Sequence, residues 1–239
     1  MMHPHETIKI YSVSTVEVAL LEIIENFKAT FEADVDVHFH TTPQLKRKNL
    51  VLEDVDMVIT TQTLVHQLLE QGELIKNSAV YLGQSKVALC TYKSSPTEEV
   101  FTVDDFFKLM IRCDEILFTE GSSGLYVETL FQDLNLKSLL ESKYKRFSKG
   151  SDMLIYLSQF SKTAHPSPWI VGLGANTEIL QFENMGVKLL CDLPDKLKHT
   201  TAYSIGRTSK TQHSDLANQF MDHLHLQHNW DLFKKSGLQ

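Results

Sequence analysis

The sequence has little cysteine, proline or glycine, and it lacks long apolar runs. It holds 3 cysteines, 6 prolines and 10 glycines in 239 residues. Cys90, Cys113 and Cys191 are an odd number and lie in apolar surroundings, which predicts buried free thiols and not a disulfide framework. No stretch approaches the roughly 20 consecutive apolar residues that a membrane-spanning helix needs. With 42% hydrophobic residues, the chain is expected to form a globular core and no membrane span.

Positive charge is also scarce. The formal net charge is −7, and the one basic run, Lys46-Arg47-Lys48, is short and is interpreted as a solvated helix face. Nucleic-acid binding depends on clustered Lys and Arg, so no nucleic-acid partner is expected. No CxxC motif or His-rich ligand spacing occurs, and we expect neither a metal site nor a cofactor.

The N-terminus, MMHPHETIKIYSV, leads directly into an apparent strand. It shows no basic n-region, no apolar h-region and no small-residue cleavage site. We therefore expect a cytoplasmic protein, the alternative being a periplasmic protein whose sequence is given in mature form. We expect a monomer.

The first third of the chain has the pattern β-α-β-α-β. Alternating apolar and β-branched residues predict strands at 7–13, 34–40 and 55–60. Between the first two, apolar residues three or four positions apart predict a helix over 16–31 with one buried face. That face is expected to contain Val18, Leu21, Ile24, Phe27 and Phe31.

The same pattern continues further along the chain. Strands are predicted at 85–92, 115–119, 169–173 and 187–190, and helices near 124–134, 151–161 and 176–184. Thr102 is expected to cap another helix. Repeated strand-helix-strand units imply α/β lobes, each with a mainly parallel sheet flanked by helices. Two helices, 214–224 and 230–235, are expected to pack back on the first lobe.

The domain organisation follows from where the chain crosses between lobes. No Pro- or Gly-rich linker occurs, so the crossings are expected within strands, near Gly83-Gln84 and Thr200-Thr201. The prediction is a discontinuous first lobe of residues 1–84 and 200–239, and a second lobe of residues 85–199. A ligand cleft is expected between them.

One local pattern recurs, in which residues with small hydroxyl side chains follow a strand and begin a helix. It occurs at Ser14-Thr15, with capping-box spacing to Glu17, and at Thr41-Thr42 before Pro43. It occurs again at Ser122-Ser123-Gly124 and at Ser151-Asp152. A helix N-terminus presents unpaired backbone N–H groups and partial positive charge, so several together can hold an anion without Lys or Arg. Taken singly, each site is better explained by plain helix capping.

Five segments, taken in order along the chain, resemble the molybdate-binding proteins of ABC transporters. They are IKIYSVSTVEVAL from Ile8, FHTTPQL from Phe39, DVDMVITT from Asp54, the segment Gly121–Tyr126 and the region 217–238. The resemblance covers nearly the whole chain. It implies the two-lobed periplasmic-binding-protein type II fold. Gly124-Leu125-Tyr126 matches a Gly-x-Tyr motif of that family.

The resemblance also implies roles for particular residues. Thr15 and Thr42 stand where the family has two oxyanion-binding serines, and Ser123 stands where a backbone N–H binds the ligand. A second backbone contact is implied at Asp152-Met153. The stretch that holds a ligand-binding tyrosine in the family corresponds here to Gly172–Ile179, which adds Asn176 and Thr177 to the candidate ligand residues.

In that stretch the tyrosine position is Ala175. The sequence of this stretch is similar to that of a branch of the family that includes an aconitate isomerase. Two threonines in place of serines also add methyl groups to the pocket. A small carboxylate therefore becomes a credible ligand beside molybdate.

Three functions are consistent with these features. The leading one is a solute-binding protein that closes on a small oxyanion or carboxylate, with membrane subunits of an ABC transporter as partners if the protein is exported. An isomerase acting on a small polycarboxylate is the second, and Glu120 and Glu178 are its candidate bases, although no catalytic residue is assigned. A cytoplasmic ligand sensor is the third. His38 and His40, two apart on one predicted strand face, are interpreted as polar surface residues.

Overall fold

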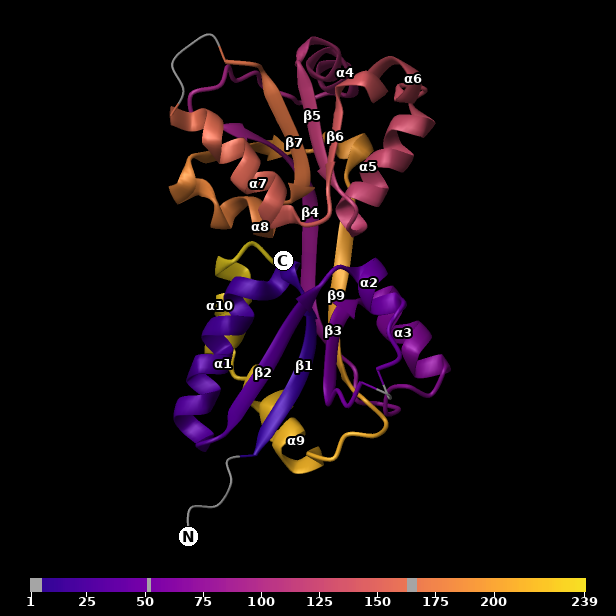
Figure 1. Cartoon of the computed structure of the whole chain (residues 1–239), viewed down its shortest axis with the longest axis vertical. Coiled ribbons are helices and arrows are strands. Elements are labelled where there is room, and N and C mark those ends of the chain that lie inside the picture. The colour runs from indigo at the N-terminus through magenta and orange to yellow at the C-terminus, as the bar shows by residue number, and fades with distance from the viewer. Residues whose placement is uncertain (1–5, 51–52, 163–166) are drawn as a thin grey trace. The chain divides into compact units, whose positions relative to one another are not determined.

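The computed structural model describes residues 6–50, 53–162 and 167–239. The chain forms two units: unit 1 is Met1–Gln84 with Ala202–Gln239, and unit 2 is Ser85–Thr201. Among the described residues, no helix is both long enough and apolar enough to cross a bilayer. The fold is mixed α/β, with helices flanking both sheets (Figure 1).

Unit 1 is built on the parallel strands that the sequence predicts. Strand β1 (Thr7–Val13) pairs in parallel with β2 (Asp34–His40) on one side and with β3 (Met57–Thr61) on the other. Strand β9 (Thr200–Arg207) runs antiparallel to β3, and β4 (Val80–Tyr92) follows it in the sheet order. The unit boundaries at Gln84 and Thr201 therefore fall within β4 and β9.

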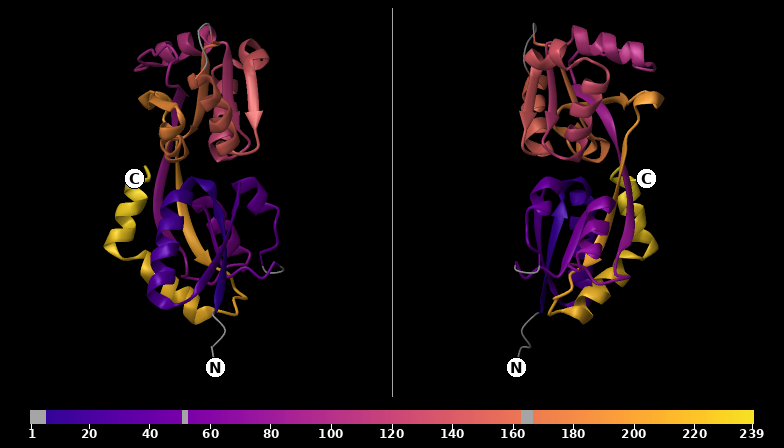
Figure 2. Two further views of the ribbon diagram at one scale, coloured as in Figure 1. Left: turned by 60° about the vertical axis from the view of Figure 1, so that its left-hand side comes forward. Right: turned by 90° about the vertical axis from the view of Figure 1, so that its right-hand side faces the viewer.

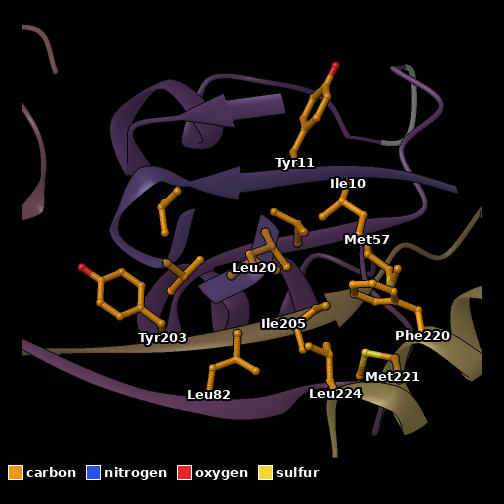
Figure 3. Packing of buried hydrophobic residues seen from close by; sticks show 14 of the residues in the cluster. Ile10, Tyr11, Leu20, Met57, Leu82, Tyr203, Ile205, Phe220, Met221 and Leu224 are labelled. Atoms are coloured by element: carbon orange, nitrogen blue, oxygen red, sulfur yellow. The ribbon is translucent and has the colours of Figure 1, made fainter. Parts of the chain in front are cut away.

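Helices cover the sheet of unit 1 and close its core. These are α1 (Glu17–Phe31), which follows a short 3-10 turn η1 (Ser14–Val16), α2 (Thr42–Lys46), α3 (Gln62–Glu70), α9 (Ser214–Leu224) and α10 (Gln227–Lys235). As predicted, the two C-terminal helices pack on the first unit, where α10 lies beside α1 (Figure 2). Figure 3 shows Ile10 pointing into this core and Tyr11 on the opposite side of β1.

The expected buried face of α1 is only partly correct, since Ile24 and Phe27 are buried as predicted. On α1 the buried residues are Ala19, Leu20, Ile23, Ile24 and Phe27, while Val18, Leu21 and Phe31 are each at least 40% exposed. The helix is turned relative to the expected face because its inner side also has to contact α9 and α10. In α9, His223 is 5% exposed and packs edge-on against Phe27.

Unit 2 has a second sheet in which β5 (Glu115–Thr119) pairs in parallel with β6 (Tyr144–Phe147) and with β7 (Ile170–Ala175). Strand β4 runs antiparallel to β7, and β8 (Val187–Asp192) pairs with β4. The helices are α4 (Val103–Arg112), α5 (Ser122–Asp133), α6 (Lys137–Leu140), α7 (Gly150–Gln159) and α8 (Asn176–Gln181). Thr102 caps α4 in a full capping box with Asp105, as predicted.

Alternation along β4 separates two cores on the faces of this sheet. Val87 and Leu89 join one cluster, which includes buried residues of α4 and α5, whereas Ala88 and Cys90 join another, which includes buried residues of α7 and α8. Successive strand residues point to opposite faces, so a strand buried on both sides is apolar throughout. Cys90 and Cys113 are buried free thiols, as predicted, whereas Cys191 is a free thiol that is only half-buried.

Candidate functional site

In both units, a helical segment begins where each parallel strand ends. In unit 1, η1 and then α1 follow β1, α2 follows β2, and α3 follows β3. In unit 2, α5 follows β5 and α8 follows β7 directly, and α7 begins after Ser148 and Lys149 at the end of β6. Because neighbouring strands lie about 4.8 Å apart, the helix starts of one unit gather along one sheet edge.

The predicted residues Ser14 and Thr15 lie at the carboxyl edge of unit 1, but not as helix caps. Both belong to the 3-10 turn η1, and neither caps α1, whose N-cap residue is Val16. The predicted capping box to Glu17 is therefore wrong, because the 3-10 turn moves the N-cap position of α1 from Ser14 to Val16. Thr15 is 7% exposed and Ser14 is half-buried.

At the end of β2, the two predicted threonines have different roles. The Thr41 hydroxyl accepts a hydrogen bond from the Gln44 backbone N–H at 3.4 Å, and the Thr41 N–H donates to Oε1 of Gln44 at 2.8 Å. This reciprocal capping box commits the Thr41 side chain to its own helix. Thr42 begins α2 and is half-buried, with no such role in capping.

Sequence reasoning did not single out the third helix start of unit 1. Thr61 ends β3 and caps α3, because its hydroxyl accepts from the Leu64 N–H at 3.4 Å. Its neighbour Thr60 is fully buried, and its Oγ1 has no hydrogen-bond partner. The pair Thr60-Thr61 after an apolar strand shows the same sequence pattern as Thr41-Thr42. The third helix start could therefore have been predicted from the sequence.

In unit 2, Ser122, Ser123 and Gly124 form the first turn of α5. The first bond of the helix runs from the Leu125 N–H to the Gly121 carbonyl oxygen at 2.9 Å, so the three preceding N–H groups have no partner within the helix. Gly124 also has a packing role, since a Cβ added there would lie 1.7 Å from the Thr119 carbonyl oxygen.

The start of α7 corrects one predicted contact. The Met153 N–H donates to the Lys149 carbonyl oxygen at 3.3 Å, and the Met153 side chain is fully buried. Met153 is therefore a core residue whose N–H is already bonded, and it is not an available donor. Ser151 and Asp152, the two residues before Met153, are exposed and keep N–H groups without an intrahelical partner.

Asn176 and Thr177 begin α8 and are both buried. The Asn176 side-chain oxygen accepts from the Lys86 backbone N–H at 2.9 Å, which ties α8 to strand β4. Thr177 is fully buried, and its Oγ1 has no hydrogen-bond partner. Asn176 therefore has an internal structural role, while the Thr177 hydroxyl is a buried polar group without a visible protein function.

Glu178, the next residue of α8, lies against the start of α7. A Cβ added to Gly150 would lie 1.8 Å from Oε2 of Glu178 and 2.7 Å from its Cδ. A carboxylate is thus in contact with the first residue of α7, where the helix dipole is positive. Sequence reasoning noted Glu178 only as an acid near the predicted cleft, because nothing in the sequence places α8 beside α7.

The edges of both units are therefore rich in backbone donors and hydroxyl groups. Backbone N–H groups at helix starts can hold an anion without a Lys or Arg side chain. In the described part of the chain, no three His, Cys, Asp or Glu side chains are grouped so that they could hold a metal ion. A hollow of about 360 Å³ in unit 2 is lined by Phe101–Asp104 and Pro194–Lys196, none of which is a predicted ligand residue.

The model of the family described as "Bacterial extracellular solute-binding protein" matches residues 8–239. An aconitate isomerase of a Pseudomonas species is 24% identical over 205 residues, which are 83% of this chain and 72% of that protein.

Two solved structures illustrate the likeness in fold. The periplasmic molybdate-binding protein of Azotobacter vinelandii is 14% identical, with a TM-score of 0.76, over 97% of this chain and 98% of that one. The sulfate-binding protein of Mycobacterium tuberculosis is also 14% identical, with a TM-score of 0.73, over 98% of this chain and 86% of that one.

Proposed function

Because this chain belongs to the bacterial extracellular solute-binding proteins, we propose that it binds a small anion between its two units. The ligand class is an oxyanion such as molybdate or tungstate, or a small carboxylate. The observation that supports this most directly is the set of helix starts at the carboxyl edge of each unit, flanked by Thr15, Thr42, Ser122 and Ser123. Such starts supply donors for an anion without a positively charged side chain.

Binding is proposed to work by closure of the two units. The chain passes from one unit to the other within β4 and β9, and a pair of strands can act as a hinge. A ligand that takes donors from both edges stabilises the closed state alone, so its differential affinity shifts the equilibrium towards closure.

The proposal includes a location and a partner. The family is described as extracellular, so the cytoplasmic location that we expected from the N-terminus has no support. We propose that the protein works outside the cytoplasm and delivers its ligand to the membrane subunits of an ABC transporter.

Thermal unfolding with a panel of anions tests the proposal. A ligand at about 100 times its Kd adds about 2.7 kcal/mol to the free energy of unfolding. For a chain of this length, that corresponds to a rise in Tm of about 5–10 °C. The panel is molybdate, tungstate, sulfate, phosphate, citrate, malate, succinate and aconitate, with chloride at equal ionic strength as the control. If none of them raises Tm above the chloride value, the proposed ligand classes are wrong.

A second function is favoured by one relative and one side chain. The Pseudomonas relative is named an aconitate isomerase, and Glu178 places a carboxylate at the edge of unit 2 where a base could act. An isomerase has to remove a proton from a carbon next to a carboxylate and return one to another carbon. Incubation with cis- and trans-aconitate, followed by chromatography, measures their interconversion. A rate equal to that of buffer alone would remove this candidate, whereas a protein-dependent rate that Glu178→Gln abolishes would support it.

A further inference from the structure

Strand β2 is the end strand of the sheet in unit 1. Its one partner among the described residues is β1, so its other side is open (Figure 1). The Asp34 N–H donates to the Glu6 carbonyl oxygen at 3.0 Å, on the β1 side. Because the backbone groups of successive residues point to opposite sides of a strand, those of Val35, Val37 and Phe39 point away from β1. An edge strand with such an open side is a template for pairing with another strand.

The side chains of β2 follow an order that is complementary to itself. The strand reads DVDVHFH, so its apolar residues share one face and its polar residues share the other. The apolar residues are half-buried and pack against the core of unit 1. The polar face has carboxylates in its first half and imidazoles in its second half, and consists of Asp34, Asp36, His38 and His40. Read in the opposite direction, the same face presents imidazoles first and carboxylates second.

Antiparallel pairing of two copies of β2 brings these groups together. When Val37 of one copy lies opposite Val37 of the other, residues with outward backbone groups face each other, as the hydrogen bonds of such a ladder require. In this register Asp36 lies opposite the second copy's His38, and the outer carboxylate likewise lies opposite the outer imidazole. Residues directly opposite each other have Cβ atoms about 4.5–5.5 Å apart, and opposite charges there stabilise the pair.

The two nearest registers that keep these hydrogen bonds lack the match. A shift of the second copy by two residues in one direction places Asp36 opposite Asp36, and a shift in the other direction places His38 opposite His38. Like charges directly opposite each other destabilise a sheet. The order of side chains on β2 therefore favours a single register, and the partner that carries the matching order is a second copy of this chain.

The contacts within one chain leave room for these pairs. His38 Nε2 lies 2.9 Å from Oδ2 of Asp36 on the same strand, and the two side chains are 48% and 53% exposed. A carboxylate accepts from more than one donor, and an imidazole donates an N–H to it when neutral and also attracts it by charge when protonated. In the paired strands, two carboxylates and two imidazoles alternate at the corners of a rectangle, so that each has neighbours of the opposite kind.

We propose that two copies of the chain associate through their β2 strands, antiparallel and centred on Val37, so that the sheets of their first units are joined. This dimer replaces the monomer that we expected from the sequence, and it does not depend on the anion-binding function. Because the paired strands run in opposite directions, the carboxyl edges of the two sheets, with their helix starts, face opposite ways.

Exchange of Asp36 and His38 tests the pairing. Asp36→His places imidazoles opposite each other, and His38→Asp places carboxylates opposite each other, whereas the chain with both substitutions restores the opposite pairs. Sedimentation equilibrium of the full chain at pH 6.5 compares them with the wild type, whose monomer has a mass of 27.3 kDa. We expect a wild-type dimer with a Kd below about 100 µM, since a strand-edge interface is small. Each single variant should raise this Kd about tenfold or more, and the double variant should return it to near the wild-type value.

A mixture of the two single variants separates pairing from any loss of folding. When an Asp36→His chain meets a His38→Asp chain, each carboxylate again lies opposite an imidazole, so the two should associate more tightly with each other than either does with itself. A misfolded chain would not be rescued by mixing. The control is Glu141→His, the same change of charge at an exposed acid of unit 2, and it should leave the Kd unchanged.

Three results would overturn this inference. One is a wild-type chain that keeps its monomer mass at about 100 µM. Another is a dimer whose Kd is equal in the wild type and in both single variants, because β2 would then not be the interface. The third is a pair of single variants that, when mixed, associate no better than each does alone.

Discussion

The rings of Tyr126 and His199 stack in unit 2, with centroids 4.0 Å apart and planes 9° from parallel. The Tyr126 hydroxyl donates to the Leu197 carbonyl oxygen at 2.9 Å, and the His199 carbonyl oxygen accepts from the Val87 N–H at 3.1 Å. The first turn of α5 is thereby tied to the segment that enters β9. Tyr126 is thus a packing residue.

The stack predicts a dependence of stability on pH. Burial lowers the pKa of His199 below its ordinary value of 6.5, and burial together with His228 lowers that of His223. As the pH falls below about 6.5, the unfolded chain takes up protons that the folded chain does not, so the free energy of unfolding decreases. Urea unfolding at pH 7.5, 6.5 and 5.5 measures this loss. In His199→Gln with His223→Gln, the dependence over that range should be shallower than in the wild type, and an equal slope would contradict the prediction.

Asn176 and Ser151 should differ in their effect on stability. Asn176→Ala leaves the half-buried Lys86 N–H without its acceptor, which should lower the free energy of unfolding by about 1–3 kcal/mol. Ser151 is exposed, and Ser151→Ala is the matched control, expected to stay within about 0.5 kcal/mol. Denaturant unfolding without ligand compares the two. Equal effects would show that the Asn176 bond does not hold α8 on β4.

Two glycine substitutions should have unequal costs. In Gly124→Ala, the new Cβ meets the backbone of Thr119, which cannot move without disturbing β5, so we expect a loss of about 1–3 kcal/mol or more. In Gly150→Ala, the Cβ meets only the end of the Glu178 side chain, which can rotate away. Thermal unfolding of both variants should place Gly124→Ala clearly below Gly150→Ala, and the reverse order would contradict this reading of the two contacts.

Substitutions at Thr41 and Thr42 should distinguish helix capping from ligand binding. Thr41→Ala breaks the capping box of α2 and should cost about 1 kcal/mol of stability in the absence of ligand. Thr42→Ala should change stability without ligand by less than about 0.5 kcal/mol. If Thr42 donates to the anion, Thr42→Ala should instead weaken binding about tenfold in calorimetry. Unchanged affinity in Thr42→Ala would remove this residue from the proposed site.

Much of the fold could be predicted because local patterns and tertiary structure agree. Strands β1, β2 and β5 and helix α9 have the bounds that the periodicity predicts. The strand β6 and the short helix α6 were missed, because four-residue elements do not display a full period. The buried face of α1 was predicted wrongly for another reason. Two faces of this helix carry apolar residues, and only the packing of α9 and α10 determines which of them is buried.

For the candidate site, the sequence by itself determined which residue types open the helices. Hydroxyl residues after apolar strands are a local signal, and they lie at the predicted helix starts of both units. Whether each hydroxyl is available was decided by tertiary structure. Thr41 is used in a capping box, Asn176 is bonded to β4, and the Met153 N–H is bonded within α7. The position of Glu178 against Gly150 was likewise decided only by packing, because residues 28 positions apart meet there when α7 and α8 lie side by side.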